Sequence, residues 1–373
     1  MTDETDGEDL RSRFQNLHEF VPAAREALPR NIWDYLIGAA ESETTMKRNR
    51  QALDSLAFRP RVLADVSSID CSTRFLGRHL ALPVAIAPVG SLESFDPDGG
   101  VAAARGAAMA GVMSMHSVVS RPDMETIAAA ADNPKVFQLY VRGGAAHVDE
   151  HVERAVAAGY DAFCITVDTA VYSRRERDIA NRFDKPWRRD ATGINHQAAF
   201  NWQDVARFKD SHRIPLILKG IATAEDALEA VRLGVEVIYV SNHGGRQLDH
   251  GRGAMSVLPE IVGAVRGRAQ IMIDGGFMRG TDVVKAIAAG ADLVGLGRLP
   301  LFALAAAGAD GVARLFEILH NEVETAMGLL GVTRLDQLNP TYLAEASPVD
   351  RPHVFSAFPL LGWEDRKYEV PGE

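Results

Sequence analysis

Short apolar runs alternate with helical segments over most of the chain. Eight short apolar runs have the length of buried strands: Leu82–Ala87, Val112–Ser117, Val136–Val141, Ala162–Val167, Pro215–Leu218, Val237–Val240, Ile271–Ile273 and Leu293–Leu296. Stretches rich in alanine and charged residues lie between them and predict helices: Gly100–Ala110, Asp123–Ala131, Val148–Ala158, Ala224–Leu233, Pro259–Val265 and Thr281–Ala289. Several helical stretches are followed by a glycine, for example Gly111 and Gly234, which is a common helix stop before the next strand.

Strands that alternate with helices predict parallel pairing. Eight such units, over the roughly 250 residues typical of the architecture, predict a closed (β/α)₈ barrel, the TIM barrel. An open doubly wound sheet is the competing architecture, but no GxGxxG opens the first unit. The barrel is therefore the expected fold.

The chain is expected to form one domain with extensions. Residues 1–13 are predicted to be disordered, 14–81 to form helices and a hairpin at Phe75–Leu80, 82–330 the barrel, and 331–373 a tail. The segment Phe183–Phe200 follows the fourth strand and predicts a lid over the barrel mouth. It is basic and aromatic, with Trp187, Arg188, Arg189 and His196. The tail is too apolar to be only solvated coil and could pack on the barrel or on a neighbouring subunit; its aromatic residues are Phe355, Phe358, Trp363 and Tyr368.

Composition narrows the class of protein. Of 373 residues, 47% are hydrophobic and 24% charged, as in ordinary globular proteins. A net charge of -10 disfavours nucleic acid or an anionic membrane as the main partner. Cys71 and Cys164 are too few for a disulfide framework. The polar N-terminus does not resemble a signal peptide, and no apolar run approaches the ~18 residues that span a bilayer. We expect a soluble cytoplasmic protein and assign no metal site.

The stretch from Ser241 to Asp249 carries the strongest chemical signal. It follows a buried strand, and its two adjacent glycines let the backbone turn sharply and approach a ligand. His243 can accept a proton, and Arg246 can bind a carboxylate through two N–H groups. A base and an anion clamp three residues apart suggest a small acidic substrate that loses a proton. The alternative is a core histidine and a surface arginine around a glycine turn.

Other strand ends add polar groups, and barrel enzymes place their chemistry at this end. They contribute the bare turn Pro88, Val89 and Gly90, against which a flat ring could lie, and then Ser117, Gln138, Tyr140, Thr166, Asp168, Arg175 and Lys219. The last two strands lead into glycine-rich loops, Asp274-Gly275-Gly276 with Arg279 and Gly297-Arg298. These loops predict a phosphate site made of backbone N–H groups and arginines. Taken singly, Asp168 could instead be a helix cap, Lys219 a plain strand-end residue and Tyr140 a core residue.

These motifs resemble the family of FMN-dependent 2-hydroxy-acid oxidases and dehydrogenases, which includes glycolate oxidase, lactate oxidase and mandelate dehydrogenase. The similarity runs from about Leu28 to Met327. Its carriers are Ile86–Pro88, Phe137–Tyr140, Thr166–Thr169, Arg174–Glu176, Leu218–Gly220, Ser241–Asp249, Asp274–Gly276 and Gly297-Arg298. The nine-residue run from Ser241 is the most specific of them.

The resemblance implies a role for each matching residue. FMN would lie across the barrel mouth with its ring against Pro88, Val89 and Gly90, bonded by Ser117, Gln138, Thr166, Lys219 and Ser241. Its phosphate would sit on the loops with Asp274, Gly275, Gly276, Gly297 and Arg298. His243 would remove a proton, Asp168 would stabilise the imidazolium, Arg175 and Arg246 would bind the substrate carboxylate, and Tyr140 would face the substrate hydroxyl. Lys219 would also attract the charge that reduced flavin gathers at one edge.

Several positions depart from the family pattern. Trp33 stands where a tyrosine hydroxyl usually helps to hold the carboxylate, and Met278 replaces an arginine at the phosphate end, a role that Arg279 could take over. Val119 stands near a bulky tryptophan of glycolate oxidase, and Tyr172 borders the same pocket. Gly90 stands where oxidases commonly carry alanine, which favours a dehydrogenase. We expect a substrate larger than glycolate or lactate, aromatic or derived from an amino acid.

These residues are compatible with three functions. The favoured one is FMN-dependent oxidation of a 2-hydroxy acid to a 2-oxo acid, with an external acceptor or oxygen and a homo-oligomeric, tetrameric assembly as in many family members. The second is FMN-dependent oxidation of a C–N centre in an amino acid or peptide. The third is a barrel without redox chemistry that binds a phosphorylated ligand.

Overall fold

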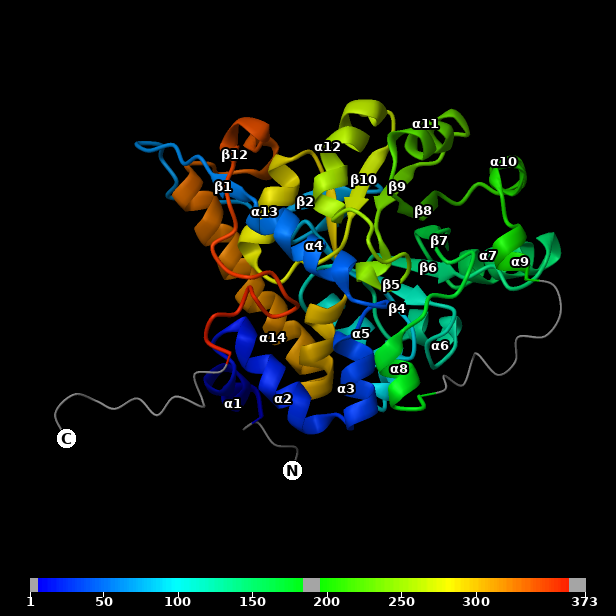
Figure 1. The fold of residues 1–373 in the computed structure, drawn as a ribbon, viewed down its shortest axis with the longest axis horizontal. Helices are drawn as coiled ribbons and strands as arrows, with labels where there is room; N and C mark the ends of the chain where they lie inside the picture. The colour runs from blue at the N-terminus through cyan, green and yellow to red at the C-terminus, as the bar shows by residue number, and fades with distance from the viewer. Residues whose placement is uncertain (1–5, 184–194, 362–373) are drawn as a thin grey trace.

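A computed structural model describes residues 6–183 and 195–361, and its centre is a closed barrel of eight parallel strands (Figure 1). The strands are β4 (Val84–Val89), β5 (Met113–Ser117), β6 (Lys135–Leu139), β7 (Ala162–Thr166), β8 (Leu216–Ile221), β9 (Val237–Val240), β10 (Gln270–Ile273) and β11 (Leu293–Leu296). They pair in chain order, and β11 closes the ring by pairing with β4. The (β/α)₈ prediction is confirmed, with each strand within a few residues of its expected bounds.

Side chains fill the inside of the barrel. Met113, Ile217, Tyr239 and Met272 belong to one fully buried cluster contributed by different strands. Gly295 has no room for a side chain, because a Cβ there would collide with the hydroxyl of Tyr239. Such a packed interior leaves the mouth of the barrel, at the C-terminal ends of the strands, as the place for a ligand.

Helices surround the barrel, and their apolar faces cover the strands. They are α5 (Gly99–Met109), α6 (Met124–Ala129), α7 (Ala145–Ala157), α10 (Trp202–Ser211), α11 (Ala224–Arg232), α12 (Ala254–Val265), α13 (Gly280–Ala288) and α14 (Arg298–Leu330), with α8 (Glu176–Ala180) and α9 (His196–Ala199) in the connection after β7. The predicted start of one helix at Pro259 is wrong, since this proline lies inside α12, which begins five residues earlier.

Helix α14 is the longest and bends within its length. Ala307 and Gly308 have non-helical dihedral angles, so two helical segments meet there. Within the described residues it is the one helix that is long and apolar enough to cross a membrane, but most of its apolar window is buried inside the protein. It is the core helix against which α5, α2 (Phe20–Ala27) and α13 pack.

The N-terminal extension caps one side of the barrel with α1 (Asp6–Arg13), α2, α3 (Arg30–Ile37) and α4 (Thr44–Asp54). The prediction of disorder over 1–13 is wrong for residues 6–13, which form α1. Arg11 is paired with Glu317 of α14 at 2.9 Å, and Phe14 is buried directly after the helix. A partner about 300 residues away is invisible to a local pattern of charged residues.

Two short sheets complete the fold. The expected hairpin at 75–80 is confirmed, with β2 (Thr73–Phe75) antiparallel to β3 (Arg78–Leu80). The tail supplies β12 (Leu343–Glu345), which pairs with β1 (Leu56–Phe58). Single 3₁₀ turns lie at Leu17–Glu19, Leu92–Ser94, His243–Gly245, Leu335–Gln337 and Pro340–Tyr342.

The tail packs on the barrel, as one of the two alternatives predicted. The ring of Phe355 stacks on Trp33 with centroids 6.0 Å apart, and Phe358 is buried. Trp363 and Tyr368 lie outside the described residues, as do Trp187, Arg188 and Arg189 of the expected lid.

Candidate active site

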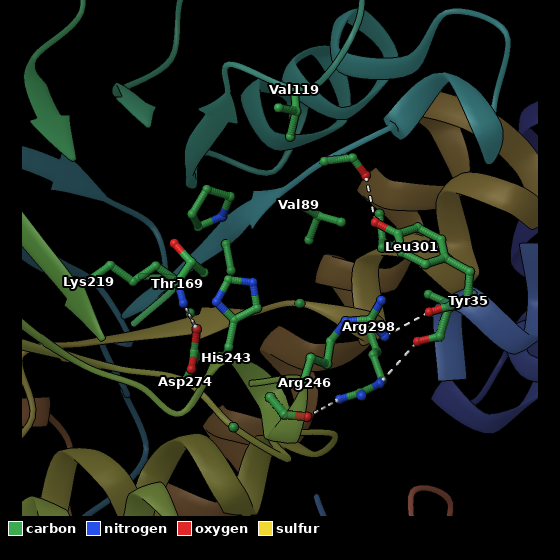
Figure 2. Close-up of a pocket in the computed structure, with 18 of the residues that line it drawn as sticks. Tyr35, Val89, Val119, Thr169, Lys219, His243, Arg246, Asp274, Arg298 and Leu301 are labelled. Atoms are coloured by element: carbon green, nitrogen blue, oxygen red, sulfur yellow. Dashed lines mark hydrogen bonds and ion pairs between the residues drawn. The ribbon is translucent and has the colours of Figure 1, made fainter. Parts of the chain in front are cut away.

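A cavity opens at the C-terminal ends of the strands and encloses about 1110 Å³, including its opening to solvent (Figure 2). Fifteen of the 22 predicted site residues line it: Pro88, Val89, Gly90, Val119, Tyr140, Tyr172, Arg175, Lys219, His243, Arg246, Asp274, Gly275, Gly276, Gly297 and Arg298. Residues from all parts of the barrel therefore meet in one space of the size that cofactor sites have.

The loop after β9 holds His243 in the cavity wall. His243 has a left-handed backbone conformation (φ 58°), and its N–H donates to Ser241 Oγ at 3.0 Å. Gly245 has no room for a side chain, since a Cβ there would lie 2.6 Å from the backbone nitrogen of Met46. The amides of Asn242 and Asn49 donate to each other at 2.7 and 2.9 Å. The loop is thus fixed against α4, and its backbone strain is held by those contacts.

Asp168 lies directly behind the imidazole. His243 Nδ1 is 3.0 Å from Asp168 Oδ1, and the carboxylate does not line the cavity. Burial acts against the charged form of Asp168, but the charge of His243 and its hydrogen bond keep the pKa of this carboxyl below its ordinary value. Burial also lowers the pKa of His243 below its ordinary value, assisted by the positive charges of Lys219 and Arg175 and opposed by Asp168. The pair therefore rests as a carboxylate and a neutral imidazole, the form of a general base.

Tyr140 faces the other ring nitrogen of this base. Its hydroxyl is 3.5 Å from His243 Nε2. Burial and the charge of Asp168 raise the pKa of Tyr140 far above its ordinary value, so the hydroxyl stays protonated. A protonated hydroxyl next to Nε2 can donate to an oxygen that binds between them.

Two buried guanidinium groups lie beside the base. Arg246 donates to the carbonyls of Tyr35 and Gly38, both at 2.7 Å, and Arg175 donates to the carbonyl of Arg246 at 3.2 Å. Burial and the charge of Arg175 lower the pKa of Arg246 from its ordinary value. Two cations buried together without a carboxylate partner of their own in the described residues make this wall a site for an anion.

Lys219 lies on the side of His243 that is opposite to Arg246, as Figure 2 shows. Its Nζ donates to Ser241 Oγ at 2.7 Å and lies 3.0 Å from Asp274. Burial opposes its charge, but Asp274 and Asp168 raise the pKa of Lys219 above its ordinary value. The cation is therefore stable at neutral pH and available to a ligand with negative charge.

The ends of β10 and β11 form a second anion site. Gly275 and Gly276 have positive φ angles, and a Cβ on either would press on Asn49 of α4 at 3.1 to 3.2 Å. Both residues line the cavity, where they present backbone atoms and no side chain. Helix α14 begins at Arg298, whose side chain donates to the carbonyls of Leu36, Gly38 and Gly244. Burial and the charge of Arg246 lower the pKa of Arg298 to about 9. Bare glycine backbone, a helix N-terminus and a guanidinium suit a phosphate.

Four predicted cofactor contacts lie behind the lining. Ser117, Gln138, Thr166 and Ser241 are all buried, and Gln138 donates to Thr166 Oγ1 at 2.8 Å. The side-chain oxygen of Gln138 is buried and accepts no hydrogen bond within the described residues. A flavin ring carries an N–H that such an acceptor could bind, so the donor and acceptor set fits FMN.

Trp33 was expected in the substrate pocket, and this prediction is wrong. Its ring packs on Phe302 and Phe355, and it does not line the cavity. Tyr35 lies there instead, with its hydroxyl 3.5 Å from the carbonyl of Gly90. Two positions along a helix rotate a side chain by about 200°, so one of these two residues faces the core while the other faces the cavity.

The prediction that Arg279 binds the phosphate is also wrong. Its guanidinium is paired with Glu322 of α14 at 2.8 Å and does not line the cavity. Met278 does line it, and is buried, so this wall has an apolar side chain beside the glycine loop. Arg298 is the arginine that faces this end of the cavity.

Sequence reasoning missed several lining residues. Apolar Phe95 and Leu301 and polar Thr169, Arg142 and Gln197 all reach the cavity. Arg142 comes two residues after Tyr140, and a strand-end loop that carries one site residue is the signal that could have identified it. Gln197 belongs to α9, the described part of the predicted lid, and donates to Thr169 Oγ1.

A profile of FMN-dependent dehydrogenases matches residues 24–345. The chain belongs to this family. It is 38% identical to a peroxisomal (S)-2-hydroxyacid oxidase of Arabidopsis thaliana over 347 residues, which is 88% of this chain and 96% of that protein. It is also 38% identical to glycolate oxidase 1 of Zea mays over 354 residues, 89% of this chain and 96% of that protein.

Solved structures of the same family share the fold. A mandelate oxidase variant with (S)-mandelic acid superimposes with a TM-score of 0.84 at 39% identity, over 90% of this chain and 99% of that one. A chimera of (S)-mandelate dehydrogenase gives 0.84 at 33% identity, over 89% and 99%. As a member of the FMN-dependent dehydrogenase family, the chain is an FMN-dependent oxidoreductase, and the third alternative, a barrel without redox chemistry, is wrong.

Proposed function

We propose that this member of the FMN-dependent dehydrogenases oxidises a 2-hydroxy acid with a bulky apolar side chain to the 2-oxo acid. The observation that carries the proposal is that His243, held 3.0 Å from the Asp168 carboxylate behind it, lines the same cavity as the guanidinium groups of Arg175 and Arg246. A base beside a carboxylate clamp suits an acid that loses hydrogen next to its carboxylate.

The reaction removes two electrons and two protons from the hydroxyl-bearing carbon and its hydroxyl. FMN, when bound, would accept both electrons and one of the two protons. Arg175 and Arg246 hold the carboxylate, so the neighbouring carbon lies against His243. His243 takes one proton, and Asp168 stabilises the resulting imidazolium through the Nδ1 hydrogen bond. Tyr140 orients the substrate hydroxyl by donating to its oxygen.

Two groups of residues that line the cavity are proposed to bind the cofactor, one the flavin ring and the other the phosphate. Pro88, Val89 and Gly90 would hold the ring, with Lys219 at the edge where negative charge develops. Gly275, Gly276, Gly297 and Arg298 would hold the phosphate. Met278 contributes no charge there, so the phosphate depends more on Arg298 than it would with two arginines. The matched test is release of FMN on dilution by Arg298→Lys, against Arg279→Lys, which we expect to retain FMN as the parent protein does.

The proposed substrate class rests on the apolar part of the wall. Val119, Leu301 and Tyr35 face the cavity around the space in front of His243 (Figure 2), and Tyr35 stacks on Phe95 with centroids 6.1 Å apart. Such a wall accommodates a side chain larger than that of glycolate or lactate. The named mandelate enzymes act on, or are studied with, aromatic 2-hydroxy acids, which supports the same class.

A substrate screen that follows anaerobic bleaching of the flavin tests the proposal. Mandelate should bleach the flavin faster than lactate and lactate faster than glycolate, and a clear preference for glycolate would refute the substrate class. Bleaching by amino acids, but not by hydroxy acids of the same side chain, would favour the second candidate, oxidation of a C–N centre.

The electron acceptor is proposed to be a molecule other than oxygen. The support is Gly90, which stands where oxidases of the family commonly carry alanine and whose Cα faces Val119. Steady-state oxygen consumption equal to substrate turnover would refute this. The cytoplasmic location and the homo-oligomeric, tetrameric state stay predictions from the sequence, and the Arabidopsis relative is peroxisomal by name.

A further inference from the structure

Helix α7 carries three side chains with metal-binding atoms on one face, outside the cavity. His147, Glu150 and His151 offer ligand atoms that all lie within 4.8 Å of one another. Their spacing of three and four residues brings them together because such positions are neighbours on a helix surface. Two imidazoles and a carboxylate form a ligand set that suits zinc and similar transition-metal ions.

His151 is the side chain that makes this more than a chance cluster. It is only 8% exposed, and its ring packs on Phe137 with centroids 6.2 Å apart. Its Nδ1 is 2.8 Å from the carbonyl oxygen of His147 and therefore donates its proton there. Nε2 then carries the lone pair, and within the described residues it has no hydrogen-bond partner. A backbone carbonyl that fixes the tautomer and aim of an imidazole is the usual support of a metal-bound histidine.

The other two side chains can close on an ion at small cost. The His147 and His151 rings are 4.2 Å apart between centroids. Glu150 is largely exposed, and within the described residues its ion pair with Arg154 is long, at 4.0 Å, so its carboxylate can rotate toward the two rings. Zinc–nitrogen bonds of about 2.0 Å at tetrahedral angles place two ligand atoms ~3.3 Å apart, so a shift of about 1.5 Å completes the set.

The surrounding charges determine how tightly the three side chains are expected to bind a metal ion. Asp149 on the same helix is bound by Arg207 and His212, so its charge is largely offset. The positive charge of Arg142 acts on His147 and opposes a bound dication. The site should therefore be weaker than a closed structural zinc site with four protein ligands.

We propose that His147, Glu150 and His151 form a binding site for a divalent transition-metal ion, with Zn²⁺ the best match, in the first half of α7, where His151 packs on Phe137. The site is independent of the proposed reaction. It lies directly after the loop that carries Tyr140 and Arg142, and His147 leans on that loop, since a Cβ on Gly143 would lie 2.5 Å from the His147 Cβ. A bound ion would tie the first turns of α7 together behind a wall of the cavity.

Calorimetric titration of the FMN-loaded, tag-free, chelator-treated protein with Zn²⁺ tests the site. The parent protein should bind one more Zn²⁺ per chain than His147→Ala, and Glu150→Gln should weaken that ion by at least about tenfold. Both substitutions are at the surface and spare the buried His151. His79→Ala is the matched control, because it removes an exposed imidazole on the β2–β3 hairpin and should bind as the parent does.

Two further measurements separate this site from zinc bound elsewhere, for example at His243. Co²⁺ should give the strong visible bands of a four-coordinate ion in the parent and not in His147→Ala. Zn²⁺ should raise the melting temperature of the parent and of His79→Ala, but not of His147→Ala. Equal stoichiometry and affinity in the parent and His147→Ala would overturn the proposal, whatever the activity of either protein.

Discussion

The Asp168→Asn substitution gives the sharpest test of the role of the Asp168 carboxylate beside His243. Asparagine keeps the shape of the side chain and a hydrogen-bonding atom, but it removes the charge beside His243. At the 3.0 Å that separates Nδ1 from Oδ1, two unit charges attract by roughly 5 kcal/mol at an effective dielectric constant of ~20. Each ~1.4 kcal/mol corresponds to a factor of ten in rate. Because asparagine retains part of the interaction, we expect kcat to fall by roughly 10³-fold.

The pH profile should change in a direction that a merely structural defect would not produce. Burial lowers the pKa of His243, and Asp168 is the group that raises it. Without the carboxylate this pKa falls further, so the neutral base persists to lower pH. The acid limb of kcat/KM should therefore move to lower pH while the plateau falls.

The assay is stopped-flow reduction of the bound flavin by the preferred hydroxy acid between about pH 4 and 9, with FMN content measured by absorbance. Asp161→Asn is the control, since Asp161 lies directly before β7 and accepts from the backbone amide of Lys135 at the start of β6, at the end of the barrel opposite the cavity. A kcat within tenfold of the parent in Asp168→Asn, at normal FMN content, would refute the role given to the carboxylate. An acid limb that moves to higher pH would refute it too.

Three other substitutions test the carboxylate-binding arginine, the substrate pocket and a buried ion pair that stabilises the fold. Arg246→Lys cannot bind a carboxylate through two N–H groups, so we expect kcat/KM for the hydroxy acid to fall about 10- to 100-fold in steady-state assays, the equivalent of one charge-assisted hydrogen bond. Val119→Trp should fill the space beside Gly90 and shift kcat/KM from mandelate toward glycolate by about tenfold or more, and an unchanged ratio would contradict the pocket assignment. Asp282→Ala leaves the buried Arg50 without its bidentate partner, and should lower the free energy of unfolding by about 3–5 kcal/mol in a denaturant titration.

The barrel could be predicted because its signals are local. Each strand is a short apolar run buried on both faces, and a glycine marks the end of many helices. The ends of these strands and helices can therefore be recognised from a few neighbouring residues. The glycine pair at Gly244 and Gly245 is visible in the sequence as a sharp turn, and both residues have positive φ angles in the structure. The strand ends then meet at the barrel mouth by geometry alone, which brought most predicted site residues into one cavity.

Three of the wrong predictions share a different cause, because each depends on a contact with another part of the chain. Arg279 looks like a phosphate ligand beside its glycines, but Glu322 on α14 binds it outside the cavity. The polar residues of α1 look disordered until Arg11 meets Glu317. Trp33 and Tyr35 are equally aromatic, and only the rotation of α3 against the barrel decides which one reaches the substrate side.

The positive charge of the cavity is kept available by the way its arginines are held. Arg246 and Arg298 donate mainly to backbone carbonyls, which fix a guanidinium in place without cancelling its charge. A carboxylate partner would orient them as well but would neutralise the site. By contrast, Arg50 and Arg177, which only support the frame, are paired with Asp282 and Glu43. The contrast follows from electrostatics: the arginines that must receive an anionic cofactor and an anionic substrate are left for those ligands to neutralise.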